Sequence, residues 1–171
     1  ILTGAGRAFS VGGDLLEFEA TLSKGGEALI ETLAYNQRVI SMIEDLPIPV
    51  IGAANGVAVA GGLEILLCCD VILASDRARF ADGHAKYGIV PAGGASVRLA
   101  ERIRPSRAAQ LFFTAGIIDA KTAEAWGLVT EIVPGANHLP LEPKKKYLNP
   151  AFWNSQVHTS FGHLSPQPGW V

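Results

Sequence analysis

The sequence predicts an α/β fold, and three observations lead to this prediction. Short apolar segments that fit β-strands alternate with longer segments that fit α-helices along most of the chain. Of the 171 residues, 49% are hydrophobic and 18% are charged, which supplies enough apolar surface for a folded core. Glycine-rich turns separate the strand candidates from the helix candidates. Together these features favour one α/β domain.

The first half of the chain is expected to contain a strand, a long helix and a second strand. Ile1–Thr3 fits a strand, and Glu27–Asp45 is the longest helical candidate. The apolar face of this helix is formed by residues at helical spacing: Leu29, Leu33, Ile40 and Ile43. The two prolines that follow end the helix, because the residue before a proline avoids the α conformation. Pro49–Ala54 is then expected to be a buried strand.

The second half of the body is expected to hold four shorter helices and three strands. The helices are expected at Gly61–Cys68, Ala95–Arg102, Arg107–Thr114 and Ala120–Trp126, and the strands at Val71–Ala74, Ala78–Ala81 and Leu128–Val133. Pro105 and Ser106 are typical of a helix start, and Gly127 is typical of a helix end.

The end of the chain differs from the body in composition. Residues 135–171 hold five of the ten prolines and show no helical or strand period, which predicts an irregular tail beside a core of residues 1–134. The lysine run Lys144–Lys146 is interpreted as a solvated patch. The chain also begins within a strand candidate, so we expect an N-terminally incomplete fold.

Charge and cysteine content exclude several classes of protein. Fourteen Lys and Arg against sixteen Asp and Glu give a net charge of −2, which argues against a nucleic-acid partner. The only cysteines, Cys68 and Cys69, are adjacent and match no metal-binding spacing. No apolar run reaches the length of a membrane span, and no leader-like start is visible. We therefore expect a cytoplasmic protein with no bound metal and no membrane partner.

The first glycine-rich turn does not fit a nucleotide site. Gly4 and Gly6 follow a strand, as in a dinucleotide-binding fingerprint, but Phe9 occupies the position of the required third glycine. The sequence also contains no phosphate-binding P-loop pattern.

Three further glycine-rich turns point to a different kind of site. They lie at Phe9–Asp14, Asn55–Glu64 and Val90–Gly94. Glycine before a helix leaves backbone N–H groups unpaired, and two such groups that meet can stabilise a negatively charged oxygen. The alternative is that these glycines only permit tight turns and close packing.

Glu64 is the most unusual residue of the body. It lies in Gly62–Cys69, where nearly every other residue is apolar. A carboxylate in apolar surroundings has a raised proton affinity, which suits a general acid or base near neutral pH. The alternatives are a glutamate that faces solvent or one that pairs with an arginine such as Arg98.

Five motifs in series give the chain a family resemblance. They are Gly6–Leu15, Leu46–Gly56, Ala60–Asp70, Gly88–Leu99 and Gly116–Val129. In this order they resemble the crotonase superfamily, also called the enoyl-CoA hydratase/isomerase family, from Ile1 to about Pro134. The resemblance implies a spiral of repeated ββα units and a truncated copy of the family's domain.

The resemblance also implies a site for acyl-CoA thioesters. Its two oxyanion-hole donors would be the backbone N–H groups of Gly13 and Gly61. Glu64 matches the first catalytic glutamate of hydratases, and His84 stands where the second would be. An imidazole can replace that carboxylate as acid or base, or His84 can be a solvent-facing loop residue.

The loop before the first helix departs from the family's pattern in two places. Val11 replaces a smaller residue, and Leu16 stands where some members carry a lysine that binds CoA phosphates. Val11, Gly12 and Asp14 are expected to contact the substrate. Coenzyme A would enter as part of the substrate, with no separate cofactor, and the full-length protein would be a homotrimer or hexamer.

The expected function is therefore enoyl-CoA hydration or isomerisation in fatty-acid or related acyl-CoA metabolism. Other crotonase chemistry, such as acyl-CoA decarboxylation, stays open, as does a non-catalytic fragment that only binds or packs. A serine peptidase of the related ClpP spiral needs a serine where Leu63 or Glu64 stands, and none is present.

Overall fold

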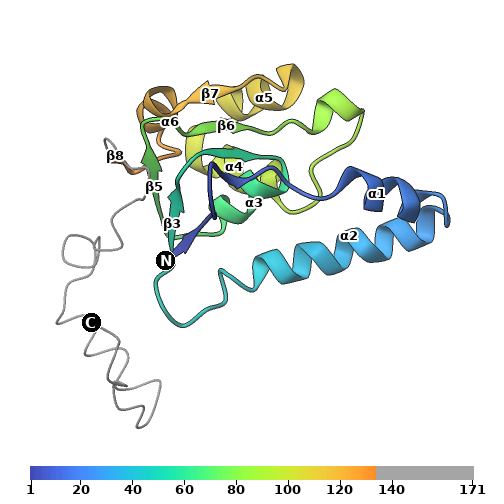
Figure 1. The fold of residues 1–171 in the computed structure, drawn as a ribbon. Coiled ribbons are helices and arrows are strands. Elements are labelled where there is room, and N and C mark those ends of the chain that lie inside the picture. The colour runs from blue at the N-terminus through green and yellow to red at the C-terminus, as the bar shows by residue number, and fades with distance from the viewer. Residues whose placement is uncertain (134–171) are drawn as a thin grey trace, which may run out of the picture. The chain divides into compact units, whose positions relative to one another are not determined.

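The fold is described from a computed structural model, which describes residues 1–133 (Figure 1). The boundary at residue 134 and the tail at 135–171 lie outside the described residues. The strands are β1 (Leu2–Thr3), β2 (Ala8–Ser10), β3 (Ile51–Ala54), β4 (Val57–Val59), β5 (Val71–Ser75), β6 (Arg79–Ala81), β7 (Ile118–Asp119) and β8 (Glu131–Val133). The helices are α1 (Leu15–Leu22), α2 (Gly26–Ser41), α3 (Gly61–Leu67), η1 (a 3-10 turn, His84–Tyr87), α4 (Ala95–Ile103), α5 (Pro105–Thr114) and α6 (Ala120–Trp126).

The strands form two four-stranded sheets. One sheet has the order β1-β3-β5-β8 and is parallel throughout, and the other has the order β2-β4-β6-β7, with only β7 antiparallel. Consecutive strands go to different sheets, so each of the pairs β1/β2, β3/β4 and β5/β6 contributes one strand to each sheet before the chain enters a helix. This is the repeated ββα arrangement that the family resemblance implies, within the mixed α/β fold that the sequence predicts.

The core lies between the sheets and helices α3 to α6. Its largest fully buried side chains include Phe80, Leu63, Leu66, Ile72 and Leu99. Helix α3 supplies two of these and packs against α4, β4 and β2. Burial of one such side chain stabilises the fold by about 1.5–3 kcal/mol, so α3 is held rigidly at its place in the core.

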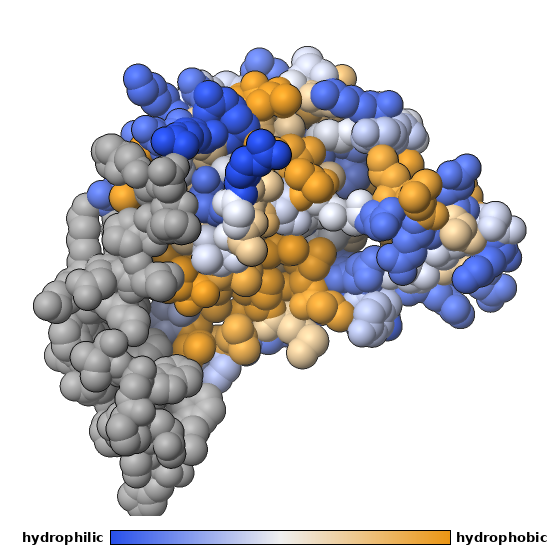
Figure 2. Space-filling view, viewed as in Figure 1, coloured by the Kyte–Doolittle hydropathy of each residue, from blue (hydrophilic) through white to orange (hydrophobic). Residues whose placement is uncertain are grey.

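Helices α1 and α2 pack against each other and extend beyond the sheets (Figure 1). Neither has a fully buried residue. The predicted apolar positions of α2, including Leu29 and Leu33, are half-buried, while Asn36 on the same stripe is exposed. Large hydrophobic side chains such as Ile30 and Tyr35 stay exposed, and Figure 2 shows hydrophobic residues in orange at the surface.

Several predicted boundaries are wrong by a few residues, for identifiable reasons. Helix α2 ends at Ser41 because residues 42–45 close as turns. The second predicted strand begins at Ile51, since the N–H of Val50 donates to the side chain of Asp70 at 2.7 Å. The last strand begins at Glu131, because residues 128 and 129 still bond the end of α6.

Five elements were not expected from the sequence: β2, α1, β4, η1 and β7. Most are only two to four residues long, too short to show a period. Within residues 1–133, no helix is long and apolar enough to cross a membrane.

Candidate functional site

Three neighbouring strands carry the predicted site residues to one edge of the second sheet. Strands β2, β4 and β6 are parallel, and β4 lies between the other two. The carboxyl ends of parallel strands meet at the same edge of a sheet. The segments that follow the three strands, residues 11–14, 60–64 and 82–84, are therefore brought together, although 67 residues (15–81) lie between the first segment and the last.

The two predicted oxyanion turns are in direct contact. A Cβ atom built on Gly12 would lie 3.1 Å from the backbone nitrogen of Gly61, and one built on Gly61 would lie 3.7 Å from the nitrogen of Gly13. Side chains here would fill the space between the turns. Within residues 1–133, no hydrogen bond occupies the backbone N–H of Gly13 or Gly61. As far as the described part of the chain shows, both donors are free for a ligand.

The residue before α3 has a strained backbone. Ala60 has φ +52° and ψ −121°, a region that non-glycine residues rarely adopt, and such strain costs on the order of 1–3 kcal/mol. The N–H of Ala60 donates to the carbonyl of Ala81 at 3.1 Å, which ties the strained residue to the end of β6. The core packing of α3 supplies the constraint, and the result is that α3 begins with an N–H, on Gly61, that no group of residues 1–133 accepts.

Glu64 lies buried in the first turn of α3, with 4% of its surface exposed. Its Oε1 accepts a hydrogen bond from the backbone N–H of Ala95 at 3.2 Å, at the start of α4. Burial raises the pKa of the Glu64 carboxyl above its ordinary value, while the N–H of Ala95 and the charge of His84 oppose the rise. Glu64 is therefore neither solvent-facing nor paired with Arg98.

The fourth glycine turn makes room for this carboxylate. A Cβ atom on Gly93 would lie 3.0 Å from Oε1 of Glu64 and closer still to Oε2. Any larger residue at Gly93 would therefore displace the carboxylate. The turn at Val90–Gly94 thus has a specific packing role at the site.

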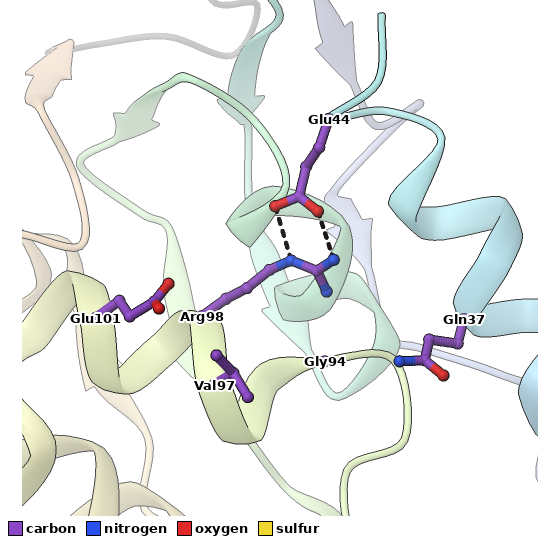
Figure 3. A pocket seen from close by; sticks show the side chains of 6 residues that line it. All are labelled: Gln37, Glu44, Gly94, Val97, Arg98 and Glu101. Carbon is purple, nitrogen blue, oxygen red and sulfur yellow. Dashed lines mark hydrogen bonds and ion pairs between the residues drawn. The ribbon is translucent and has the colours of Figure 1, made fainter.

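Arg98 supports the same turn from its outer side. Its Nη1 donates to the carbonyl of Gly93 at 2.8 Å, and its Nε donates to Oε1 of Glu44 at 2.8 Å. Figure 3 shows the two-pronged contact between Arg98 and Glu44. Arg98 and Glu44 line a pocket of about 310 Å³, together with Gln37, Gly94, Val97 and Glu101. None of the lining residues is a predicted site residue, so the pocket is a neighbour of the candidate site.

His84 begins the 3-10 turn after β6 and is largely buried, with 11% of its side chain exposed. Its Nδ1 lies 2.9 Å from Oδ1 of Asp82. Burial alone would lower the pKa of His84, but the hydrogen bond and charge of Asp82, together with the charge of Glu64, raise it above its ordinary value. The charges of His84 and Glu64 therefore act on each other. The burial of His84 excludes the interpretation that it is a solvent-facing loop residue.

The remaining predicted residues lie at the rim of the site. The side chain of Val11 is 68% exposed, and Gly12 has φ +95°, which favours glycine. Asp14 accepts from the N–H of Leu16 at 2.8 Å and caps helix α1. That contact gives Asp14 a structural role beside the predicted contact with substrate, and Leu16 is itself exposed.

Sequence reasoning missed the supporting residues of the site. The buried carboxylate of Asp82 was not predicted as part of the site, although its spacing of two residues from His84 was a usable signal. The contacts of Glu64 with Gly93 and Ala95 left no such signal, because they join residues about 30 positions apart.

Comparison with known proteins gives the class to which this fold and site belong. The family model of enoyl-CoA hydratase/isomerase matches residues 1–142. The chain therefore belongs to the enoyl-CoA hydratase/isomerase family.

Particular relatives agree with this assignment. A crotonyl-CoA hydratase of Syntrophomonas wolfei is 39% identical over 145 residues, which are 85% of this chain and 55% of the relative. The crystal structure of an enoyl-CoA hydratase from Bacillus anthracis is 36% identical with a TM-score of 0.72 and covers 77% of this chain and 50% of its own. An enoyl-CoA hydratase structure from Polaromonas has a TM-score of 0.74 at 29% identity, covering 78% and 52%. The chain spans about half the length of these relatives.

Proposed function

We propose that this protein, with its full family domain, is an enoyl-CoA hydratase that stabilises a thioester enolate. The observation that carries the proposal is the contact between two turns whose backbone N–H groups, on Gly13 and Gly61, have no hydrogen-bond partner among residues 1–133. One fixed donor of this kind contributes about 2.7–4 kcal/mol to the stability of an oxyanion transition state. The crotonyl-CoA hydratase relative supports a short 2-enoyl-CoA as the first substrate to test.

In this proposal Glu64 and His84 divide the proton chemistry. The Glu64 carboxylate takes a proton from water as the water oxygen bonds to the β-carbon of the enoyl thioester. The electron pair of the double bond moves to the thioester oxygen, which the N–H groups of Gly13 and Gly61 hold. The His84 imidazolium then gives its proton to the α-carbon, and exchange with solvent restores both groups.

The charges at the site support this division of roles. The acid must be protonated while the base is ionised, and an imidazolium beside a carboxylate meets that demand without two like charges. Activity should follow a bell-shaped pH profile that belongs to the coupled pair. Its acidic limb should lie above the ordinary pKa of 4.5 for glutamate, because burial raises the pKa of Glu64. Its basic limb should lie above 6.5, because Asp82 and Glu64 outweigh the effect of burial on the pKa of His84.

The central test is Glu64→Gln. The amide keeps the shape of the side chain and loses its proton chemistry, so crotonyl-CoA hydration should fall by at least ~100-fold while binding of the thioester stays close to normal. The rate of hydration is measured from the loss of ultraviolet absorbance of the conjugated thioester, and the affinity for the thioester is measured by calorimetry. Glu31→Gln, an exposed glutamate of α2, is the matched control. Equal activity of both variants would remove Glu64 from the mechanism.

A second candidate function is double-bond isomerisation, because the second carboxylate of the hydratase pattern is replaced by His84. Glu64 alone can carry a proton between two carbons. In that case His84→Ala should change turnover little, and His84→Glu should add hydration without loss of isomerisation. A large loss of turnover in the His84→Ala variant would support hydration as the function. Carbon dioxide release from a malonyl thioester, without hydration or isomerisation, would contradict both.

The assembly of the full-length protein is proposed to be a homotrimer or hexamer. Exposed hydrophobic side chains on α2, among them Ile30 and Val39, support a contact face between subunits. Light scattering coupled to gel filtration measures the mass, and a monomer at micromolar concentration would contradict the proposal.

A further inference from the structure

Asp82 is a buried carboxylate, and within residues 1–133 both of its hydrogen-bond partners belong to His84. Its surface is 1% exposed. Oδ1 lies 2.9 Å from the Nδ1 of His84, and Oδ2 accepts from the backbone N–H of the same residue at 3.3 Å. Burying a charge is costly unless hydrogen bonds compensate it, so the contact with the imidazole and the contact with the backbone N–H both help to stabilise this carboxylate.

We propose that Asp82 is a positioning residue that fixes the imidazole of His84, with Nδ1 bonded to the Asp82 carboxylate and Nε2 directed to the acyl group. This inference rests on the proposed function, because it assumes that His84 exchanges a proton with the substrate. It adds a third group to the pair formed by Glu64 and His84.

The hydrogen bond determines which nitrogen can do chemistry. An ionised carboxylate only accepts hydrogen bonds, so Nδ1 carries a proton in both the neutral and the charged imidazole. Nε2 is then the only nitrogen that gains or loses one. Within residues 1–133, Nε2 has no hydrogen-bond partner, whereas every fully buried side-chain nitrogen or oxygen has one, so Nε2 is open to solvent and to a ligand.

The strands place this pair next to the oxyanion turn. Gly83, between the two residues, has φ +75°, and a Cβ atom on it would lie 2.9 Å from Val59. Val59 is the last residue of β4, and the strained Ala60 and the candidate oxyanion donor Gly61 follow it directly. The turn that carries His84 therefore packs against the end of strand β4, which leads directly into the candidate oxyanion turn.

The charged surroundings favour an imidazolium that acts as an acid. The two charged groups that act most strongly on the imidazole are Asp82, on its own turn, and Glu64, on α3, and both are negative. Cations of the neighbouring elements include Arg79, on strand β6, Lys86, in the same 3-10 turn, and Arg107, on helix α5, which packs against that turn. An attractive charge at hydrogen-bond distance stabilises the protonated form.

A purely structural role for Asp82 would be limited to its hydrogen bond with the backbone N–H of His84, and two measurements separate that role from positioning. In the unaltered full chain, nitrogen-15 NMR should show Nδ1 of His84 protonated at every pH and Nε2 titrating. The His84 signals are identified by their loss in His84→Gln. If the neutral imidazole carries its proton on Nε2 instead, the inference is overturned, whatever the activities of the variants are.

The second measurement uses Asp82→Asn, which keeps the size of the side chain and removes its charge. The pKa of His84 should fall, the basic limb of kcat/KM should move to lower pH, and kcat should drop by about 10–100-fold. Asp45→Asn, an exposed aspartate, is the control and should change none of these. In a His84→Gln background, Asp82→Asn should have no further effect on kcat.

The outcomes separate failure of this inference from failure of the proposed function. If His84→Gln lowers turnover but Asp82→Asn leaves both the pKa of His84 and the basic limb unchanged, the positioning role is wrong and the function stands. If His84→Gln is as active as the unaltered protein, the proposed role of His84 is wrong, and the positioning role falls with it.

Discussion

Gly93→Ala should disable the candidate site without disrupting the core. The added Cβ atom would lie 3.0 Å from Oε1 of Glu64 and closer to Oε2, and these separations are too short for atoms that are not bonded. The backbone of Gly93 does not have a positive φ, so alanine itself adopts the required conformation. The strain therefore falls on the carboxylate of Glu64, which must move.

The size of the effect follows from the contacts of that carboxylate. Displacement breaks the 3.2 Å hydrogen bond from the N–H of Ala95, and hydrogen bonds to charged groups contribute about 1.5–3 kcal/mol. Gly93→Ala should therefore lower the free energy of unfolding by about that amount. A shift of about 1 Å in a catalytic group costs on the order of 100-fold in rate, so hydration should fall similarly if Glu64 is the base.

The assay is a double-mutant cycle measured by denaturant unfolding. Glu64→Ala removes the side chain that Gly93→Ala displaces, so in that background Gly93→Ala should cost no more than about 0.5 kcal/mol. Gly26→Ala is the control, because a Cβ atom there meets nothing within 4 Å, and it should be neutral or stabilise by up to about 1 kcal/mol. Equal costs of Gly93→Ala with and without Glu64 would refute the packing argument.

Three further predictions concern the oxyanion donor Gly61, the cap of helix α1 and the two cysteines. Gly61→Pro should lower both thioester binding and turnover, because proline lacks the N–H of the oxyanion site, and normal kinetics in a folded variant would locate the site elsewhere. Asp14→Ala should lower the free energy of unfolding by about 1 kcal/mol through loss of the cap on α1, and Asp14→Asn should keep most of it. Cys68 and Cys69 should resist alkylation at neutral pH until the protein unfolds, because burial raises the pKa of each thiol to about 11, and fast labelling of the native chain would contradict this.

The sequence alone was sufficient to predict the elements that local features, such as helical spacing and capping residues, specify. The α2 stripe, with Leu29 and Leu33 half-buried, follows from helical spacing, and α6 has the predicted bounds because Asp119 caps its start and Gly127 ends it. The glycine turns and the anomalous Glu64 were also visible, since a carboxylate stands out in an apolar segment. Short strands such as β2 and β7 were missed, because pairing with other strands holds them in place and their own residues carry no period.

Only the tertiary structure decided how the site residues meet. Glu64 and Gly93 belong to different units of the spiral, and their contact depends on the packing of α3 against α4. The interpretation of His84 as acid or loop residue stayed open in the sequence, because the answer depends on the buried carboxylate of Asp82 and on the pairing of β6 with β4. A sequence specifies what each residue can donate, accept or bury. The burial, and the register of strands far apart in the chain, set the charge and direction of those groups, and that is why the chemistry of the site is a property of the fold.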